Sequence, residues 1–190
     1  MAGSGGAAAG GPGAGSTETC LVVVRGPSGA GKSTVARAVR RRMGRGTALV
    51  EQDYLRRTLM WEKDTAGAPN IGLIDTVVRH ALGVGYSVVL EGILAADHYG
   101  TMLRDLLTDH RGRTVCAYLD VPWDETLRRH ETRPQVADFT PEQMAEWFDP
   151  DDRLGVDGEI VVDAASSAER TVETLLAAAG WTGARGRGSA

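Results

Sequence analysis

One stretch of nine residues constrains this chain more than any other. Directly after the apolar run 20–25, residues 26–34 read Gly-Pro-Ser-Gly-Ala-Gly-Lys-Ser-Thr, which satisfies the pattern G-x-x-x-x-G-K-[ST] between a strand and a helix. With this composition, about 0.004 such matches are expected by chance. Glycines let successive backbone N–H groups converge on a phosphate, and the helix that follows adds its partial positive charge. The motif therefore predicts a nucleotide site.

Within this loop each residue type has a chemical reason. Lys32 is expected to bridge the β- and γ-phosphates, and the Ser33 hydroxyl is expected to ligate Mg²⁺. Only Lys32 and Lys63 are lysines, and the other basic residues are arginines, which suggests that a compact ammonium is required at position 32. The residues assigned to nucleotide binding are Gly26, Ser28, Gly29, Ala30, Gly31, Lys32, Ser33 and Thr34.

The rest of the chain alternates short apolar runs with longer amphipathic ones. Such alternation is typical of βα units around a parallel sheet, so we expect a doubly wound α/β domain. Asn70 is expected to cap one helix that ends at Gly83, and another is expected over 101–110. Capping boxes predict helices starting after Thr140 and after Ser166. The five predicted strands are 20–25, 47–52, 86–90, 114–120 and 159–162.

Glycine and charge divide the chain into a body and two ends. Residues 1–19 and 182–190 are rich in glycine, and we expect disordered tails there and a single domain over 20–181. The first stretch lacks the features of a signal peptide and no apolar run approaches a membrane span, so a cytoplasmic protein without membrane contact is expected. Cys20 and Cys116 lie in apolar runs and are expected to be buried thiols.

A carboxylate follows the second predicted strand. Because sites in parallel sheets form at the carboxyl ends of strands, Asp53 should lie near the γ-phosphate. It could accept a proton from an attacking hydroxyl, and Arg56 could hold the acceptor or the transferred group. Alternatively, Asp53 is only the N-cap of the next helix. Both interpretations can hold together.

Two further groups belong to the predicted site. Glu91 follows the third strand, where a carboxylate can hold Mg²⁺ or orient the acceptor. Arg129 and Arg133 are four residues apart, which places them on one face of a helix leading into a proline-containing loop. We interpret them as a lid that neutralises charge during transfer; the alternative is a solvated basic face.

Together these residues resemble the small P-loop kinases that phosphorylate hydroxyl groups. The superfamily includes polynucleotide 5′-hydroxyl kinases, zeta-toxin-like kinases, chloramphenicol phosphotransferase and shikimate- or gluconate-type kinases. The sequence motifs are most similar to those of the polynucleotide 5′-hydroxyl kinase domain. The similar features are the loop 26–34, the D-x-x-R that begins at Asp53, and the D-V-P-W of 120–123 followed by the lid arginines. The resemblance, over about residues 20–150, implies ATP as donor, Asp53 as general base and a P-loop NTPase fold with strand order 2-3-1-4-5.

The hypotheses about function differ in the molecule that would accept the phosphoryl group. Residues 20–181 carry a net charge of −5, since Glu18, Arg185 and Arg187 contribute +1 to a total of −4, and an acidic body fits a polynucleotide poorly. A small metabolite or antibiotic-like molecule is therefore the first choice, with Trp61 and Tyr54 as candidates for stacking, although core packing is the commoner role for such a tryptophan. The alternatives are a polynucleotide 5′-hydroxyl kinase and an ATP-dependent switch that controls a partner. Oligomeric state is left open.

Overall fold

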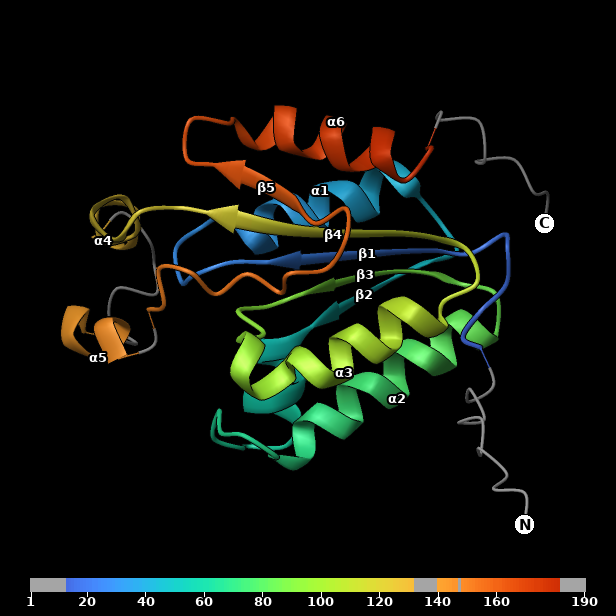
Figure 1. Ribbon diagram of the computed structural model, residues 1–190, viewed down its shortest axis with the longest axis horizontal. Coiled ribbons are helices and arrows are strands. Elements are labelled where there is room, and N and C mark those ends of the chain that lie inside the picture. Colours follow the sequence, from blue (N-terminus) through green and yellow to red (C-terminus); the bar gives the residue numbers. More distant parts are fainter. Residues whose placement is uncertain (1–12, 132–139, 147, 182–190) are drawn as a thin grey trace, which may run out of the picture.

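The computed structural model describes residues 13–131, 140–146 and 148–181. Within them, five parallel strands form one sheet in the order β2-β3-β1-β4-β5 (Figure 1). This order confirms the one that the resemblance implied. The strands are β1 Cys20–Arg25, β2 Thr47–Glu51, β3 Ser87–Glu91, β4 Arg113–Asp120 and β5 Ile160–Asp163.

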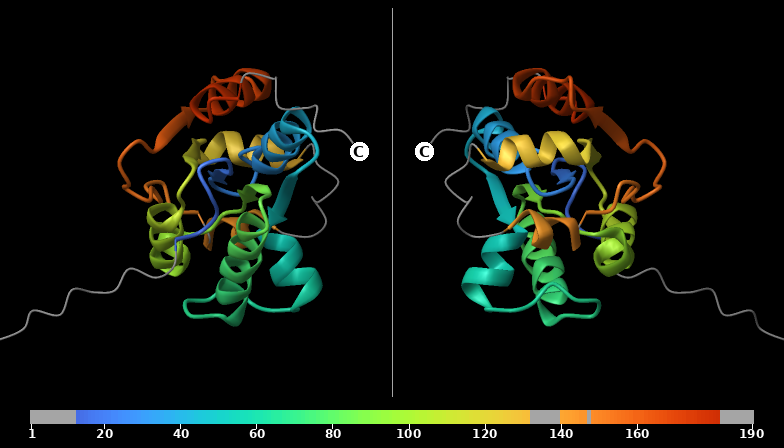
Figure 2. Two further views of the ribbon diagram at one scale, coloured as in Figure 1. Left: turned by 90° about the vertical axis from the view of Figure 1, so that its right-hand side faces the viewer. Right: turned by 90° about the vertical axis from the view of Figure 1, so that its left-hand side faces the viewer.

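Helices cover both faces of the sheet. The views from either end agree that α1 and α6 lie on one side and α2 and α3 on the other (Figure 2). Two short helices, α4 and α5, lie beyond the carboxyl ends of the strands (Figure 1). The helices are α1 Lys32–Met43, η1 Tyr54–Leu59, a π-helix, α2 Pro69–Gly83, α3 Ala96–Asp109, α4 Trp123–Glu131, α5 Pro141–Glu146 and α6 Ala168–Ala178.

Successive side chains of β1 point to opposite faces of the sheet and belong to two separate hydrophobic clusters. All six of its residues are buried, as expected for the central strand of a parallel sheet. Val22 and Val24 pack with α1 and α6, whereas Leu21 and Val23 pack with α2 and α3. Each helix offers a stripe of apolar side chains three or four residues apart, such as Ile74, Val78 and Leu82 on α2. The strand that leads into the glycine-rich loop is therefore packed on both faces.

Most predicted elements are confirmed, with their ends displaced by one or two residues. The helix predicted over 101–110 begins earlier, at Ala96, and Asn70 is not a cap: it lies inside α2, after Pro69, and its amide donates to the Tyr99 hydroxyl. At α6 the capping residue is Ser167, one position after the predicted Ser166, and its hydroxyl accepts from the backbone N–H of Arg170. The first serine of the pair instead lies in the turn before the helix.

Packed structure begins before residue 20, which is the predicted start of the domain. Ala14 is buried; its N–H donates to the carbonyl of Asp109, and its carbonyl accepts from Arg111. The Thr19 hydroxyl is 3.0 Å from Nε2 of His110, whose Nδ1 is 2.7 Å from the Thr114 hydroxyl. Residues 13–19 thus pack on the amino edge of the sheet through backbone and side-chain contacts, although the sequence analysis predicted a tail there.

The buried histidine at this edge predicts a pH effect on stability. Burial lowers the pKa of His110, so the unfolded chain binds the proton more readily than the folded one. The stability that this group contributes is complete above its unfolded pKa of about 6.5 and is lost as the pH falls through that value. We expect the Tm to fall further between pH 8 and pH 5.5 in the wild type than in His110→Gln. Equal falls in thermal melts would contradict this account.

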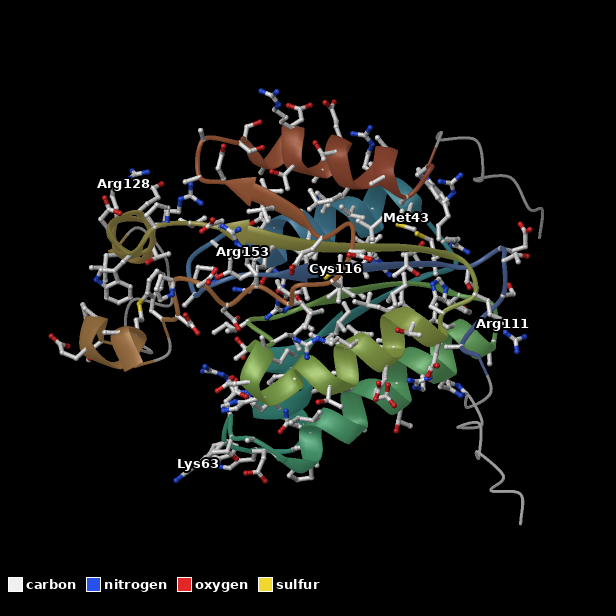
Figure 3. The ribbon with its side chains drawn as sticks, viewed as in Figure 1. Met43, Lys63, Arg111, Cys116, Arg128 and Arg153 are labelled. Carbon is white, nitrogen blue, oxygen red and sulfur yellow. The ribbon has the colours of Figure 1, made fainter. Side chains whose placement is uncertain are left out.

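Both cysteines are buried, as predicted, and Cys116 lies in the middle of the sheet (Figure 3). Burial, with a smaller contribution from Glu159, raises the pKa of its thiol to about 12. Within the described residues, no helix has the length and apolar character needed to cross a membrane.

Candidate active site

The loop between β1 and α1 is shaped by glycines that no other residue replaces easily. Gly26 has φ 145°, and a Cβ there would lie 2.7 Å from the Leu119 carbonyl oxygen of the neighbouring β4. Gly31 has φ 97° and forms the N-cap of α1 without any side-chain cap. No acidic residue lies in the first turn of α1. A helix N-terminus without a side-chain cap and without an acidic residue in its first turn suits the binding of an anion.

Lys32 is held inside this loop. The side chain is nearly buried, at 8% exposure of the residue, and its Nζ donates to the carbonyl of Pro27 over 2.7 Å. An ammonium group already placed against the loop is pre-organised for a phosphate bound in the same curve of backbone.

A hydroxyl and a carboxylate meet next to this lysine. The Ser33 hydroxyl donates to Oε1 of Glu91 over 3.0 Å, which joins the first turn of α1 to the end of β3. Glu91 is buried, and burial raises its pKa, whereas the charge of Lys32 and the bond from Ser33 act against this shift. The nearby charges of Glu51 and Asp53 add to it. The two residues predicted to bind the metal are thus in contact, and the charge of Lys32 acts on the pKa of Glu91.

These oxygens fit the ligand preference of Mg²⁺. In proteins this ion takes oxygen ligands, and it is commonly held by one or two protein groups together with substrate phosphates and water. The residues that the structure describes hold no cluster of three or more His, Cys, Asp or Glu of the kind that binds a metal alone. The pair formed by Ser33 and Glu91 suits an ion that arrives with a nucleotide.

The candidate base lies at the next strand end and is open to solvent. Asp53 has a side-chain exposure of 66% and accepts from Nη2 of Arg56 at 3.0 Å and from Nε of Arg57 at 3.2 Å. Asp53 occupies the N-cap position of η1, but its side chain makes no capping bond to that helix. Arg56, by contrast, is only 10% exposed at its side chain. An exposed carboxylate oriented by a buried arginine can accept a proton from a bound hydroxyl.

On the other side of the loop, Arg129 contacts the glycine-rich segment. It donates from Nε to Glu125 at 2.6 Å, from Nη1 to the Ala30 carbonyl at 3.3 Å and from Nη2 to the Ala164 carbonyl at 3.3 Å. The second predicted lid arginine, Arg133, lies outside the described residues. Arg129 thus joins α4 both to the loop and to the segment after β5.

A pocket of ≈ 460 Å³ opens beside these contacts. Its walls come from the glycine-rich loop, the first turns of α1, the face of α4 and the segment after β5. Figure 3 shows Arg128 on α4 at this carboxyl edge of the sheet, where the loop with Lys63 also lies. The lining includes Ala30, Gly31, Thr34, Val35, Arg128, Arg129 and Ala164 through Ser167.

The aromatic candidates for stacking are not part of the core. Trp61 is 90% exposed and Tyr54 is 57% exposed. Trp61 also has φ 55°, a left-handed conformation that residues with a side chain rarely adopt. Core packing, which the sequence analysis considered the commoner role for Trp61, is therefore wrong, and stacking remains a proposal.

Sequence reasoning missed a buried arginine at the end of β1. Arg25 has 0% exposure, pairs with Asp152 at 3.1 Å and Glu159 at 3.4 Å, and donates to the Leu94 carbonyl. It directly precedes Gly26, so these bonds attach the start of the glycine-rich loop to the segments before α3 and β5. A charged residue closing an otherwise apolar strand was the only available signal.

Comparisons with known proteins agree with this geometry. The AAA_33 family model, described as an AAA domain, matches residues 21–150. A search of curated proteins finds no match. Similar solved structures include a sugar kinase from Janibacter sp. HTCC2649, at 21% identity and TM-score 0.61 over 87% of this chain and 97% of that one. Another is the Mycobacterium tuberculosis APS kinase CysC in complex with AMPPNP and APS, at 18% identity and TM-score 0.62 over 88% and 98%. A gluconokinase from Sinorhizobium meliloti 1021 matches at 19% identity and TM-score 0.58 over 87% and 93%.

Proposed function

Because the chain belongs to the AAA_33 family of P-loop kinases, we propose that it transfers the γ-phosphoryl group of ATP to a hydroxyl of a small molecule. One observation carries the proposal: the strand ends assemble Lys32, the Ser33–Glu91 pair and the exposed carboxylate of Asp53 at one edge of the sheet. A simple nucleotide switch needs the first two groups but has no need of an arginine-held base beside them. The sugar kinase and the gluconokinase share this fold, which supports a small acceptor.

The nucleotide would lie along the glycine-rich loop. Its phosphates would contact the loop amides and Lys32, and its base would occupy the pocket of ≈ 460 Å³ between α4 and the segment after β5. The proposal that ATP is the donor rests on membership of the family. The APS kinase of similar fold was solved in complex with AMPPNP and APS. Mg²⁺ bound by Ser33 and Glu91 would supply positive charge to the β- and γ-phosphates.

Asp53 and Arg56 would serve the acceptor. The hydroxyl proton passes to the Asp53 carboxylate as the oxygen attacks the γ-phosphorus and the bond to the ADP oxygen breaks. Arg56 orients Asp53 through its 3.0 Å bond. Lys32 and Arg129, with Arg133 assigned by its spacing alone, neutralise charge on the transferred group.

A labelled γ-phosphate transfer screen tests the function. The compounds are sugars, other hydroxylated metabolites, nucleosides, hydroxyl-bearing antibiotics and oligonucleotides, with Lys32→Ala as the blank. The proposal expects label in a small hydroxylated compound. Label only in an oligonucleotide, with steep salt dependence, would instead support a polynucleotide kinase. Slow hydrolysis without any labelled acceptor, with ATP-dependent binding of a partner, would support a switch.

The contacts of Arg129 predict an effect on nucleotide binding. Arg129→Ala removes the contacts to the Ala30 and Ala164 carbonyls, which join the loop to the proposed base pocket. We expect the KM for ATP to rise about tenfold and kcat to fall, with a smaller effect on the KM of the acceptor. Arg79→Ala is the matched control, because Arg79 has the same side-chain exposure, 28%, and also pairs with an acidic residue one turn earlier on its helix, Asp75, outside the proposed base pocket. Equal effects of the two substitutions in steady-state kinetics would remove the specific role of Arg129.

A further inference from the structure

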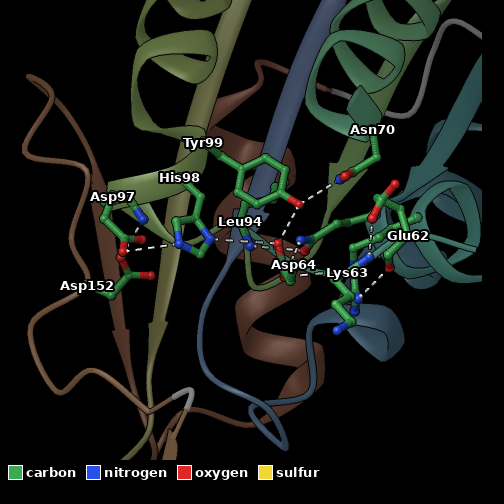
Figure 4. A network of polar contacts seen from close by, with 12 residues as sticks. Glu62, Lys63, Asp64, Asn70, Leu94, Asp97, His98, Tyr99 and Asp152 are labelled. Carbon is green, nitrogen blue, oxygen red and sulfur yellow. Dashed lines mark hydrogen bonds and ion pairs between the residues drawn. The ribbon is translucent and has the colours of Figure 1, made fainter. Parts of the chain in front are cut away.

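A cluster of polar side chains lies behind the proposed acceptor site, and the function described above does not use it. Figure 4 shows the cluster centred on Asp64, in the loop between η1 and α2. Oδ1 of Asp64 accepts from the Tyr99 hydroxyl at 2.7 Å, and Oδ2 accepts from Nε2 of Gln52 at 3.1 Å. Tyr99 in turn accepts from Asn70 at 2.8 Å. We call Gln52, Asp64, Asn70 and Tyr99 the Asp64 cluster.

The cluster joins four segments that are distant in sequence. Gln52 directly follows β2, Asn70 lies on α2 and Tyr99 on α3, and all three are buried, at 1%, 0% and 0% exposure. Asp64 is the one acidic member, and both of its oxygens accept bonds from the others. Removing this carboxylate therefore leaves the buried donors of Gln52 and Tyr99 without their acceptor.

Through Gln52 the cluster reaches the loop that follows Glu91. The Gln52 Oε1 accepts from the backbone N–H of Leu94 at 3.0 Å, and Leu94 has φ 49°. A Cβ at Gly92 would collide with the Gln52 side chain, so this glycine permits the close approach. One glutamine thus binds together the ends of β2 and β3, which carry the proposed base and the proposed metal carboxylate.

Through Arg56 the cluster reaches the proposed base. Nη2 of Arg56 donates to Asp53 at 3.0 Å, Nη1 donates to the Glu62 carbonyl at 3.3 Å, and Nε lies 3.8 Å from Oδ2 of Asp64. The guanidinium is thereby placed between two carboxylates, one exposed at the site and one in the cluster behind it. Its Nε is buried and makes no hydrogen bond among the described residues, so the contact with Asp64 is an ion pair only.

We propose that Asp64 is a positioning residue for phosphoryl transfer, which holds Arg56, and through it Asp53, in the orientation that the acceptor hydroxyl requires. This inference rests on the proposed function. It differs from a purely structural role, because it concerns where a reacting group points as well as whether the domain is folded. Misplacement of a reacting group by about 1 Å can lower a rate by about 10²-fold.

The test compares Asp64→Asn with Asp109→Asn in the full chain. Asn keeps the shape of the side chain but presents an amide N–H₂ to one of the two donors that Asp64 accepts from. Asp109 is a matched control: it is 28% exposed against 27% for Asp64, and it also pairs with an arginine, Arg79, at 2.8 Å. It lies at the end of α3 that faces the amino edge of the sheet.

The kinetic probe is the small hydroxyl compound that the wild type phosphorylates most rapidly in the transfer screen. For Asp64→Asn we expect kcat to fall about 10- to 100-fold and the KM for ATP to stay within about twofold. Asp64→Glu, which keeps the charge, should recover part of kcat. Asp109→Asn should lower the Tm without a specific change in kcat.

Each alternative outcome has a distinct meaning. Unchanged kcat in Asp64→Asn overturns the inference while leaving the proposed function in place. So does a loss of kcat that equals the loss of folded protein, or an equal loss in Asp109→Asn. A wild type that phosphorylates no compound in the screen overturns the proposed function, and this inference with it.

Discussion

Asp53→Asn is expected to lower kcat for phosphoryl transfer by about 10²- to 10⁴-fold, the usual range for loss of a general base. The substitution keeps the size of the side chain and an oxygen that can accept from Arg56, which is 3.0 Å away. It removes the ability to take up the hydroxyl proton, together with the charge that pairs with Arg56 and Arg57. Because Asp53 is 66% exposed, we expect little change in folding stability. Steady-state kinetics with ATP and the acceptor, together with thermal melts, measure both effects.

Nucleotide binding separates this effect from general damage to the site. The Kd of ATP in Asp53→Asn should stay within about twofold of the wild type, since the proposed contacts of the phosphates are with the loop amides and Lys32 and not with Asp53. Asp105→Asn, which also removes an exposed carboxylate, on α3, is the control and should transfer phosphate at the wild-type rate. A full rate in Asp53→Asn would show that this residue is not the base.

The second large effect is expected at Lys32. Lys32→Ala should lower transfer by about 10³-fold, because it removes the ammonium group that stabilises charge on the γ-phosphate. Its Nζ bond to the Pro27 carbonyl is also lost, and because this bond is buried, we expect a folded protein whose Tm is somewhat below that of the wild type.

Lys32→Arg sharpens the same prediction. Arginine is the usual basic residue of this chain, yet the enclosed position of Lys32, at 8% exposure, leaves little room for a planar guanidinium. We therefore expect Lys32→Arg to recover less than a tenth of the wild-type kcat. Recovery of the full rate would mean that any cation serves and that the geometry of the loop is not decisive.

Local sequence signals were sufficient to predict the sheet and the phosphate loop. The pattern over 26–34 depends on residues adjacent in the chain, and the apolar runs identify strands wherever both faces of the sheet are covered. Asp53 and Glu91 were identified as candidates for the same reason, because both lie at the carboxyl ends of strands, Asp53 just after β2 and Glu91 as the last residue of β3. These groups lie close to the elements that position them.

The contacts that orient the site could not be predicted, because they join distant segments. Gln52 bonds to Asp64 and to Leu94, a separation of up to 42 residues, and nothing in the local sequence distinguishes it from an ordinary strand-end glutamine. Arg25 reaches Asp152 across 127 residues. Trp61 was misjudged for a related reason: average burial of tryptophan says little about a residue in a loop at the open edge of a sheet.

The most direct test of the central claim is the stoichiometry of ADP and phosphorylated acceptor, measured together by mass spectrometry in the presence of ATP and Mg²⁺. The account predicts one phosphate ester on a hydroxyl of a small molecule for each ADP formed, and neither product with Lys32→Ala. ADP accompanied only by inorganic phosphate, across the whole set of acceptors, would contradict it.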